Sequence, residues 1–278
     1  MKIIAESSST RTEWALVDGV EIVEHAFTEG LNPYFQSRRE ISHSIRLDLP
    51  GTFFKKRWDH VYFYGAGCAN AHKNKIMESS LVAQFKTPVT VESDLLGAAR
   101  GLLVNEKGIA CILGTGSNSC FYDGAKITHN VRPLGFILGD EGSGSYLGKM
   151  FVSDCLKGLA PKEICEEFYE QYEVTPDEIM DAVYSNTLPN KTLSAYSTFL
   201  SEKIENEYVY NLIYDSFLRF FKRNIVAYDY EKYPISFVGA TACLYSEILI
   251  KVAEDFGAEI KKIIKGSMPG LIEFHAKD

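Results

Sequence analysis

A chain of 278 residues can form two domains, or one large domain, and bury a sizeable core. Its 46% hydrophobic and 24% charged residues are typical of a globular protein, and a net charge of −8 argues against a nucleic-acid partner. No stretch approaches the ~18 apolar residues of a membrane helix, and no apolar signal segment opens the chain. We therefore expect a cytoplasmic protein that binds neither nucleic acid nor membranes.

The first predicted elements are strands joined by short turns. The apolar run 3–5 precedes small polar residues at 7–10, a strand pattern covers 14–17, and Asp18-Gly19 predicts a tight turn before a third strand at 20–27. Further strands are predicted at 61–64 and 88–91. A helix over 95–103 follows, and Ser93 or Asp94 is a suitable cap for it.

The second half repeats the opening pattern. A strand at 109–113 meets Gly114-Thr115-Gly116-Ser117, and a strand at 119–122 ends at a second Asp-Gly pair, Asp123-Gly124. Laying Asp18 over Asp123 also lays Thr10 over Thr115. Strands rather than a helix follow the glycine turn, which argues against a Rossmann fold or a P-loop. Two such hairpins, with their backbone N–H groups converging across a cleft, suit a polyphosphate. The polar residues at 105–108 predict a boundary between domains 1–107 and 108–278.

The rest of the second half is mostly helical. Apolar residues recur with a helical period over 208–225 and over 244–256, where Gly257 stops the pattern. The polar segment 161–206 is predicted to be a helical insertion. The glycine-rich segment 135–148 surrounds Asp140 and Glu141, and its apolar flanks predict a loop folded into a cleft, where acids can hold metal-bound water or sugar hydroxyls. Asp94, at a strand-to-helix junction, is either a helix cap or a general base.

These features combine in an order that is specific although each is weak alone. The chain resembles the N-acetylglucosamine kinase-like branch of the BadF/BadG/BcrA/BcrD ATPase family, within the superfamily of sugar kinases, heat-shock chaperones and actin, and the resemblance rests on the Thr10 turn and on segments 30–35, 62–68, 93–99, 114–119 and 138–144. The resemblance implies an α/β fold of two duplicated ribonuclease-H-like domains, as in actin-like ATPases and sugar kinases, with a central cleft that holds Mg-ATP and a sugar.

The resemblance also implies roles for single residues. Asp94 would accept the proton of the sugar's 6-hydroxyl, and Glu6 would hold Mg²⁺ through water. The sugar contacts would be Asn32, Gly65, Asn118 and Asp140. The ATP contacts would be Ser8, Ser9, Thr10 and Arg11 in the first turn, Gly114, Thr115, Gly116 and Ser117 in the second, and Gly239 and Ala240 beside the adenosine.

The first turn departs from the family pattern Asp-x-Gly-x-Thr. Glu6 stands in place of the aspartate and adds a methylene. Ser8 stands in place of the glycine and adds a side chain where the phosphate must approach the backbone. Both changes bear on the rate of any reaction at this turn rather than on the fold.

Three functions follow from this reading. The first is ATP-dependent phosphorylation of the 6-hydroxyl of N-acetylglucosamine or a related amino sugar, by a homodimer as in relatives. The second is a non-catalytic or weakly active sugar or nucleotide sensor. The third is an ATPase activator of a radical dehydratase, whose cysteines share an iron–sulfur cluster between subunits. The six cysteines here are scattered, without a C-x-x-C pair and mostly in apolar runs, which favours buried structural thiols.

Overall fold

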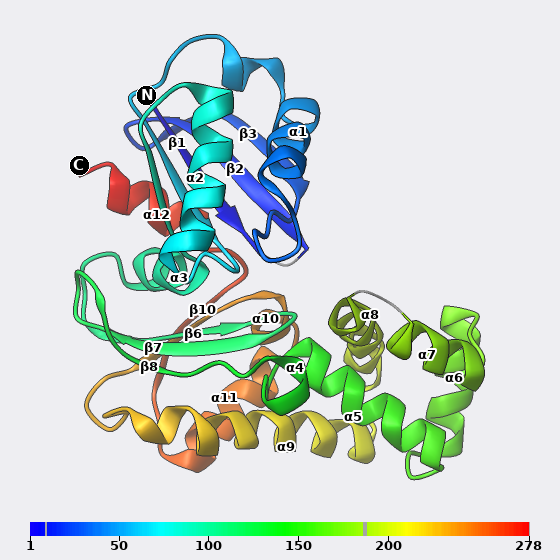
Figure 1. Cartoon of the computed structure of the whole chain (residues 1–278). Helices are drawn as coiled ribbons and strands as arrows, with labels where there is room; N and C mark the ends of the chain where they lie inside the picture. Colours follow the sequence, from blue (N-terminus) through cyan, green and yellow to red (C-terminus); the bar gives the residue numbers. More distant parts are fainter. Residues whose placement is uncertain (9, 186–187, 278) are drawn as a thin grey trace. The chain divides into compact units, whose positions relative to one another are not determined.

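The computed structural model describes residues 1–8, 10–185 and 188–277. Its contacts divide the chain into two compact units. Unit 1 comprises Met1–Ala110, Tyr122–Thr128 and Gly266–Asp278, and unit 2 comprises Cys111–Phe121 and His129–Lys265. The last segment of the chain therefore returns to unit 1, which also takes in the turn between two strands of the second half (Figure 1).

Unit 1 is built on a five-stranded sheet with the order β3-β2-β1-β4-β5. Strand β1 runs antiparallel to β2 and parallel to β4, and β4 runs parallel to β5. The strands are β1 (Lys2–Ser7), β2 (Arg11–Asp18), β3 (Glu21–Glu29), β4 (His60–Gly65) and β5 (Val89–Ser93). The helices are α1 (Arg38–Asp48), the 3₁₀ helix η1 (Gly51–Phe54), α2 (Ala71–Phe85), α3 (Asp94–Leu103) and α12 (Met268–His275).

The second sheet repeats this order. Its strands are β6 (Gly108–Leu113), β7 (Ser117–Tyr122), β8 (Ile127–Val131), β9 (Ile235–Val238) and β10 (Ile260–Ile264), arranged β10-β9-β6-β7-β8. Read from β8, the strands follow in the order third, second, first, fourth and fifth along the chain, which is the order of unit 1 read from β3. The duplication predicted from the two Asp-Gly hairpins is confirmed, and with it the α/β fold of two ribonuclease-H-like halves.

Helices make up most of the remaining chain. They are α4 (Gly135–Leu138), α5 (Gly144–Lys157), α6 (Lys162–Tyr172), α7 (Pro176–Tyr184), α8 (Pro189–Tyr196), η2 (Ser197–Lys203), α9 (Glu207–Arg223), η3 (Ile225–Ala227), α10 (Ala240–Leu244) and α11 (Ser246–Phe256). The insertion at 161–206 is helical, as predicted. The segment 135–148 is not a plain loop, because it contains α4 and begins α5. Gly257 ends α11 in the left-handed conformation that glycine adopts without strain.

Strand alternation determines the core of unit 1. Successive side chains of a strand point to opposite faces of the sheet. Ile3 and Ala5 therefore join the large cluster that contains Trp14 and residues of α1 and α2, whereas Ile4 joins Leu271 of α12 in a smaller cluster on the other side. The C-terminal helix thus closes one face of the first sheet.

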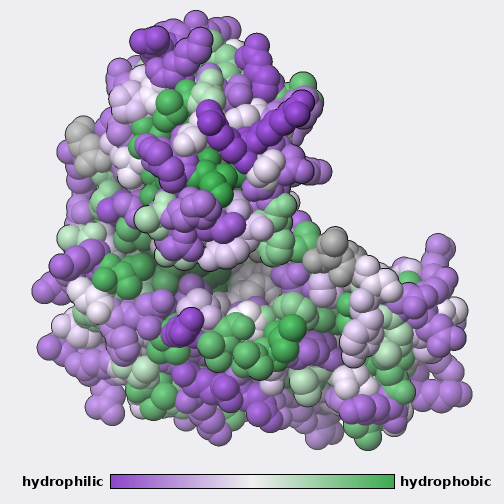
Figure 2. All heavy atoms as spheres, in the orientation of Figure 1, coloured by the Kyte–Doolittle hydropathy of each residue, from purple (hydrophilic) through white to green (hydrophobic). Residues whose placement is uncertain are grey.

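The surface is mostly polar on the face shown in Figure 2. Hydrophobic side chains gather there over the region of α4, in agreement with the exposure of Leu134, Ile137 and Leu138. Within the described part of the chain, no helix combines the length and the apolar character needed to cross a bilayer.

Candidate functional site

The predicted residues of unit 1 meet at one edge of its sheet. Strands β1, β4 and β5 are parallel neighbours, and their register places Ser7 beside Gly65 and Gly65 beside Ser93. In open α/β sheets, ligands bind at the carboxyl ends of the strands. The structure therefore brings together Glu6 and the first turn, Gly65, and Asp94 at the start of α3. Asn32 joins this group, because the Ser7 hydroxyl bonds both the N–H and the carbonyl of neighbouring Leu31.

Asp94 is the first residue of α3. Ser93 is the cap, since its hydroxyl accepts the N–H of Leu96 at 3.2 Å. Of the two residues that the sequence offers as the helix cap, the structure thus selects Ser93. Oδ1 of Asp94 accepts the N–H of Leu95 at 2.8 Å. Burial raises the pKa of Asp94, and the two backbone hydrogen bonds to its carboxylate oppose that rise. A carboxylate with a raised pKa at the edge of the sheet where ligands bind is suited to accept a proton.

The first turn connects β1 to β2 and is closed by its own side chain. The N–H of Ser8 donates to the carbonyl of Arg11 at 3.0 Å. The Ser8 hydroxyl in turn accepts the N–H groups of Thr10 and Arg11, each at 3.3 Å. Serine hydroxyls in turns make such bonds to the backbone two or three residues on. The Ser8 side chain thus occupies two backbone N–H groups of the turn. Ser9 lies outside the described residues.

Arg11 and Glu6, on either side of this turn, are engaged elsewhere. The Arg11 guanidinium lies 4.6 Å from the centre of the Phe27 ring, a cation–π contact. The Glu6 carboxylate accepts the hydroxyl of Ser267 and, at 3.2 Å, the N–H of the same residue. Burial raises the pKa of Glu6, the Ser267 hydrogen bonds lower it, and the nearby Glu13 and Asp94 raise it further.

The second turn lies in unit 2, and hydrogen bonds from other segments of that unit hold it in place. The Gly114 carbonyl accepts the N–H of Gly144 at 2.8 Å and the hydroxyl of Thr241 at 2.9 Å, and the Thr115 carbonyl accepts the N–H of Ser145 at 3.1 Å. The first residues of α5 and of α10 therefore fix the turn. A side chain at Gly114 would meet no atom within 4 Å, so the turn leaves open space beside its backbone.

Gly239 lies directly against this turn. Its φ is +131°, and a Cβ there would lie 2.2 Å from the Leu113 carbonyl oxygen. Its N–H donates to Ile264 of β10, and Ala240 begins α10. Three segments far apart in sequence, namely the second turn, the start of α5 and Gly239–Ala240, thus converge within unit 2. Only glycine fits at position 239 without moving the turn.

Asp140 completes this group. Its φ is +60°, a left-handed conformation that is uncommon for a residue other than glycine. Oδ1 accepts the N–H of Ser117 at 3.3 Å. Burial raises the pKa of Asp140, the Ser117 bond lowers it, and neighbouring Glu141 raises it. Glu141 itself pairs with Arg223 at 2.6 Å. A strained backbone that places a half-buried acid beside a glycine turn is typical of functional sites.

Asn118 is hydrogen-bonded to Asn130, a residue that the sequence did not indicate. Its Oδ1 accepts the N–H of Ser119 at 2.9 Å and the Nδ2 of Asn130 at 3.0 Å. Asn130 also donates to the carbonyls of Ser119 and Val131. Asn130 and Ser267 are thus the residues of these sites that sequence reasoning missed. Ser267 contacts a segment far away in the chain, Asn130 contacts the neighbouring strand, and neither belongs to a recognisable motif.

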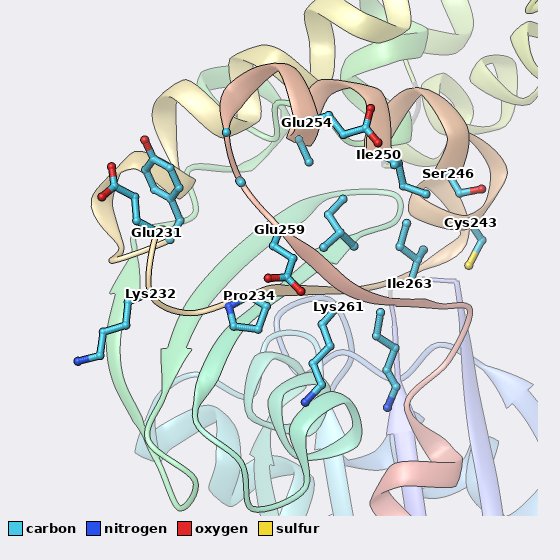
Figure 3. A pocket seen from close by; sticks show the side chains of 16 residues that line it. Glu231, Lys232, Pro234, Cys243, Ser246, Ile250, Glu254, Glu259, Lys261 and Ile263 are labelled. Atoms are coloured by element: carbon cyan, nitrogen blue, oxygen red, sulfur yellow. The ribbon is translucent and has the colours of Figure 1, made fainter.

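Two further observations concern possible metal ligands and the pocket in unit 2. In the described part of the chain, no cluster of three or more His, Cys, Asp or Glu could hold a metal ion. A pocket of about 880 Å³ lies between β10 and α11 and is lined by residues such as Cys243, Glu259 and Lys261 (Figure 3). None of the predicted site residues that the structure describes lines it, so it is separate from the groups above.

Solved structures provide the comparison. One from Porphyromonas gingivalis, described as a "Putative N-acetylglucosamine Kinase", is 38% identical over 100% of this chain and 99% of that chain, with a TM-score of 0.96. One of the same description from Chromobacterium violaceum has a TM-score of 0.67 at 14% identity, over 98% of each chain. A "putative N-acetylmannosamine kinase" from Listeria monocytogenes has a TM-score of 0.54 at 14% identity, over 99% of this chain and 98% of that one.

The last two likenesses show the fold, which is that of sugar kinases and actin-like ATPases. No protein-family model matches the chain, and a search of curated proteins found no match. The Porphyromonas gingivalis protein matches from end to end at an identity that shows common descent. This chain therefore belongs to the family of N-acetylglucosamine kinase-like proteins.

Proposed function

We propose that the protein is a sugar kinase that transfers the γ-phosphoryl group of Mg-ATP to the 6-hydroxyl of N-acetylglucosamine or a related amino sugar. The observation that carries the proposal is Asp94, a half-buried carboxylate at the carboxyl edge of the first sheet, whose pKa is raised by desolvation. The similarity to the Porphyromonas gingivalis protein supports the sugar class.

In this mechanism, Asp94 acts as the base. As the sugar oxygen forms its bond to the γ-phosphorus, its proton passes to the Asp94 carboxylate, and the bond to the β–γ bridging oxygen breaks to release ADP. Leu95 holds one carboxylate oxygen, which orients the other. Phosphoryl transfer passes through a loose transition state, so the main contribution of such a base is to orient the hydroxyl.

We assign nucleotide binding to the second turn together with Gly239 and Ala240. Small residues allow the phosphates and the ribose to approach the backbone closely, and the bonds from Gly144, Ser145 and Thr241 hold the turn in place beforehand. Mg²⁺ would arrive with ATP and be bound by phosphate oxygens and water, as is usual for this ion. Each oxygen of Glu6 keeps a lone pair beyond its bond to Ser267, so a water-mediated contact to the metal fits this residue.

The sugar contacts in this proposal are neutral or acidic groups that suit hydroxyls. Asn32, Asn118 and Asp140 supply amide and carboxylate atoms, and Gly65 would contact the sugar through its backbone. A side chain at position 65 would collide with Phe63 of the core. These residues bind a polyol by hydrogen bonds without attracting a second anion.

The sensor alternative rests on the closed first turn. If the Ser8 hydroxyl keeps the amides of Thr10 and Arg11, the protein would bind nucleotide weakly and turn it over slowly. The activator alternative has less support. Five of the six cysteines are buried, and a cluster shared between subunits needs thiols at the surface.

The test is a coupled assay of ADP release with Mg-ATP and a panel of amino sugars. We expect sugar-dependent turnover, reduced by about 10²–10⁴-fold in Asp94→Asn, which keeps the shape but cannot accept the proton. Asp123→Asn is the matched control, because Asp123 also accepts two backbone N–H groups but lies in an exposed turn. Turnover that survives in Asp94→Asn, or no ADP with any sugar, would refute the kinase proposal. A sugar-induced rise in melting temperature without ADP would favour the sensor.

A further inference from the structure

The N-terminal end of α12 is tied to the end of β1 by a single serine. Ser267 precedes the helix and donates both its hydroxyl and its N–H to the carboxylate of Glu6, one to each oxygen. Ser267 is fully buried, with no exposed area. Glu6 is separated from the first turn only by Ser7, which is itself buried and bonded to Thr12 at 2.8 Å. A displacement of Glu6 is therefore transmitted directly to the turn.

Ser267 is also held from the side of α3. A Cβ on Gly101 would lie 2.2 Å from the Cβ of Ser267, and a Cβ on Gly270 would lie 1.9 Å from the Gly101 carbonyl oxygen. The backbones of α3 and α12 thus touch where both carry glycine. Since α3 begins with Asp94, the same serine lies between the strand that leads to the first turn and the helix that carries the candidate base.

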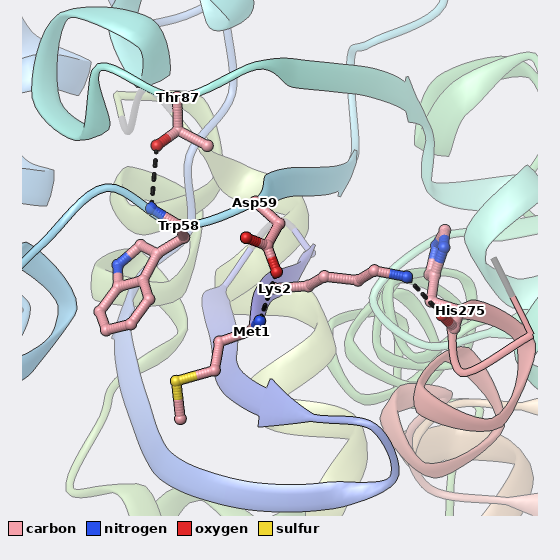
Figure 4. Close-up of polar contacts among 6 residues, drawn as sticks. All are labelled: Met1, Lys2, Trp58, Asp59, Thr87 and His275. Atoms are coloured by element: carbon pink, nitrogen blue, oxygen red, sulfur yellow. Dashed lines mark hydrogen bonds and ion pairs between the residues drawn. The ribbon is translucent and has the colours of Figure 1, made fainter.

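The other end of α12 is anchored independently. Lys2 donates to the carbonyl of His275 at 2.9 Å (Figure 4), and the Tyr64 hydroxyl bonds the His275 ring at 2.8 Å. Arg100 of α3 donates to the same hydroxyl at 2.9 Å and lies over the Phe274 ring. Loss of the Ser267 contact would therefore free the Glu6 end of the helix without undocking the whole element.

We propose that Ser267 is a positioning residue of the nucleotide site, which fixes the end of β1 through Glu6 and thereby sets the affinity for Mg-ATP. The inference rests on the proposed kinase function. It makes the C-terminal segment Gly266–Asp278, which follows unit 2 in the chain but belongs to unit 1, part of the structure that binds the nucleotide. A hydrogen bond to a charged group is stronger than a neutral one, so its loss is measurable.

The test is a double-mutant cycle of Ser267→Ala and Glu6→Gln. We expect Ser267→Ala to raise the KM for Mg-ATP about tenfold and to leave kcat and the KM for the sugar within about twofold. Glu6→Gln should raise the KM for Mg-ATP at least as much, and the double variant should be no worse than Glu6→Gln alone. Calorimetric binding of ADP, with and without Mg²⁺, gives the same comparison without turnover. Hydrogen exchange should increase in the peptide that contains residues 1–8.

Thr175→Ala is the control. Like Ser267, Thr175 directly precedes a helix and donates its hydroxyl to a glutamate, Glu178, but it lies in the insertion of unit 2. It should leave both KM values unchanged. A purely structural role for Ser267 would lower kcat through loss of folded protein and leave KM as it was, and additive effects in the cycle would show that the two residues do not act together. Either result overturns the proposal. An inactive wild-type protein that still binds ADP would instead refute the kinase function, and the calorimetric cycle would still decide the role of Ser267.

Discussion

The two turns that follow the first strand of each sheet have the same place in the fold, but different groups hold them. The turn of unit 1 is closed by its own Ser8 hydroxyl, which accepts the amides of Thr10 and Arg11. The turn of unit 2 is supported through its carbonyls, by Gly144, Ser145 and Thr241. Its N–H groups at Gly114 and Ser117 donate to the Gly116 carbonyl and to Asp140, so no hydroxyl of the turn itself accepts them. Duplication of a strand pattern therefore does not duplicate the hydrogen bonding of its turn. Readiness for an anion depends on which acceptor occupies the backbone amides, and one side chain can change that.

The largest effect is expected where the second turn meets Gly239. Gly239→Ala places a methyl group 2.2 Å from the Leu113 carbonyl oxygen and demands a strained backbone. We expect a loss of about 2–4 kcal/mol in the free energy of unfolding, together with loss of detectable nucleotide binding. Urea unfolding and ADP calorimetry measure the two effects. Gly158→Ala, at a left-handed helix end with open space, is the control for backbone strain alone. Equal effects of both variants would remove the special role of the contact with Leu113.

The next effect concerns the support of the second turn by α10. Thr241→Val keeps the shape but removes the hydroxyl that donates to the Gly114 carbonyl at 2.9 Å. We expect a cost of about 1 kcal/mol in stability and a several-fold rise in the KM for Mg-ATP. Thr241→Ser, which retains the hydroxyl, should behave like the wild type. If valine and serine gave the same KM, the support from α10 would not matter for binding.

The first turn should respond in the opposite direction. Ser8→Gly removes the hydroxyl that occupies the amides of Thr10 and Arg11, so phosphate can bind them. We expect the affinity for Mg-ATP to rise by about three- to tenfold, despite a small loss of stability from the added backbone freedom. Ser8→Ala separates the hydroxyl from the side-chain volume. Weaker binding in Ser8→Gly would mean that the serine itself contacts the nucleotide, and the contrast between the two turns would disappear.

A pH dependence follows from the raised pKa of Asp94. The charged form is the base, so kcat/KM should fall as the pH drops through this raised pKa, and the acidic limb should be absent from any residual activity of Asp94→Asn.

The free energy of unfolding should depend on pH in the opposite direction. A carboxyl whose pKa is raised by folding binds its proton more tightly in the folded state, so its stabilising contribution is present at low pH and is lost as the pH rises through that pKa. Asp94→Asn should therefore melt at a higher temperature than the wild type at neutral pH. A lower melting temperature would contradict the burial cost assigned to this carboxylate.

Local patterns were enough to predict the repeated strands and several helices. The Asp-Gly turns fixed the hairpins, and the period of apolar residues predicted α9 and α11, because each signal lies within one element. The resemblance to the kinase family selected Asp94, the two turns and Gly239 as candidates. Their roles remain predictions, and Ser9 lies outside the described residues.

Tertiary structure alone decided how these candidates are held. Nothing in the local sequence places Ser267 on Glu6 or α12 on the first sheet, because these pairs lie far apart in the chain and leave no periodic pattern. Asn130 and Asn118 lie on the neighbouring strands β7 and β8, but no motif marks the bond between them. The substitution at Ser8 is visible in the sequence, but its consequence depends on where the hydroxyl points within the turn. The amino-acid sequence thus determined the duplicated scaffold through local strand and turn preferences. Long-range packing determined which polar groups of that scaffold are already bonded and which are left for a ligand.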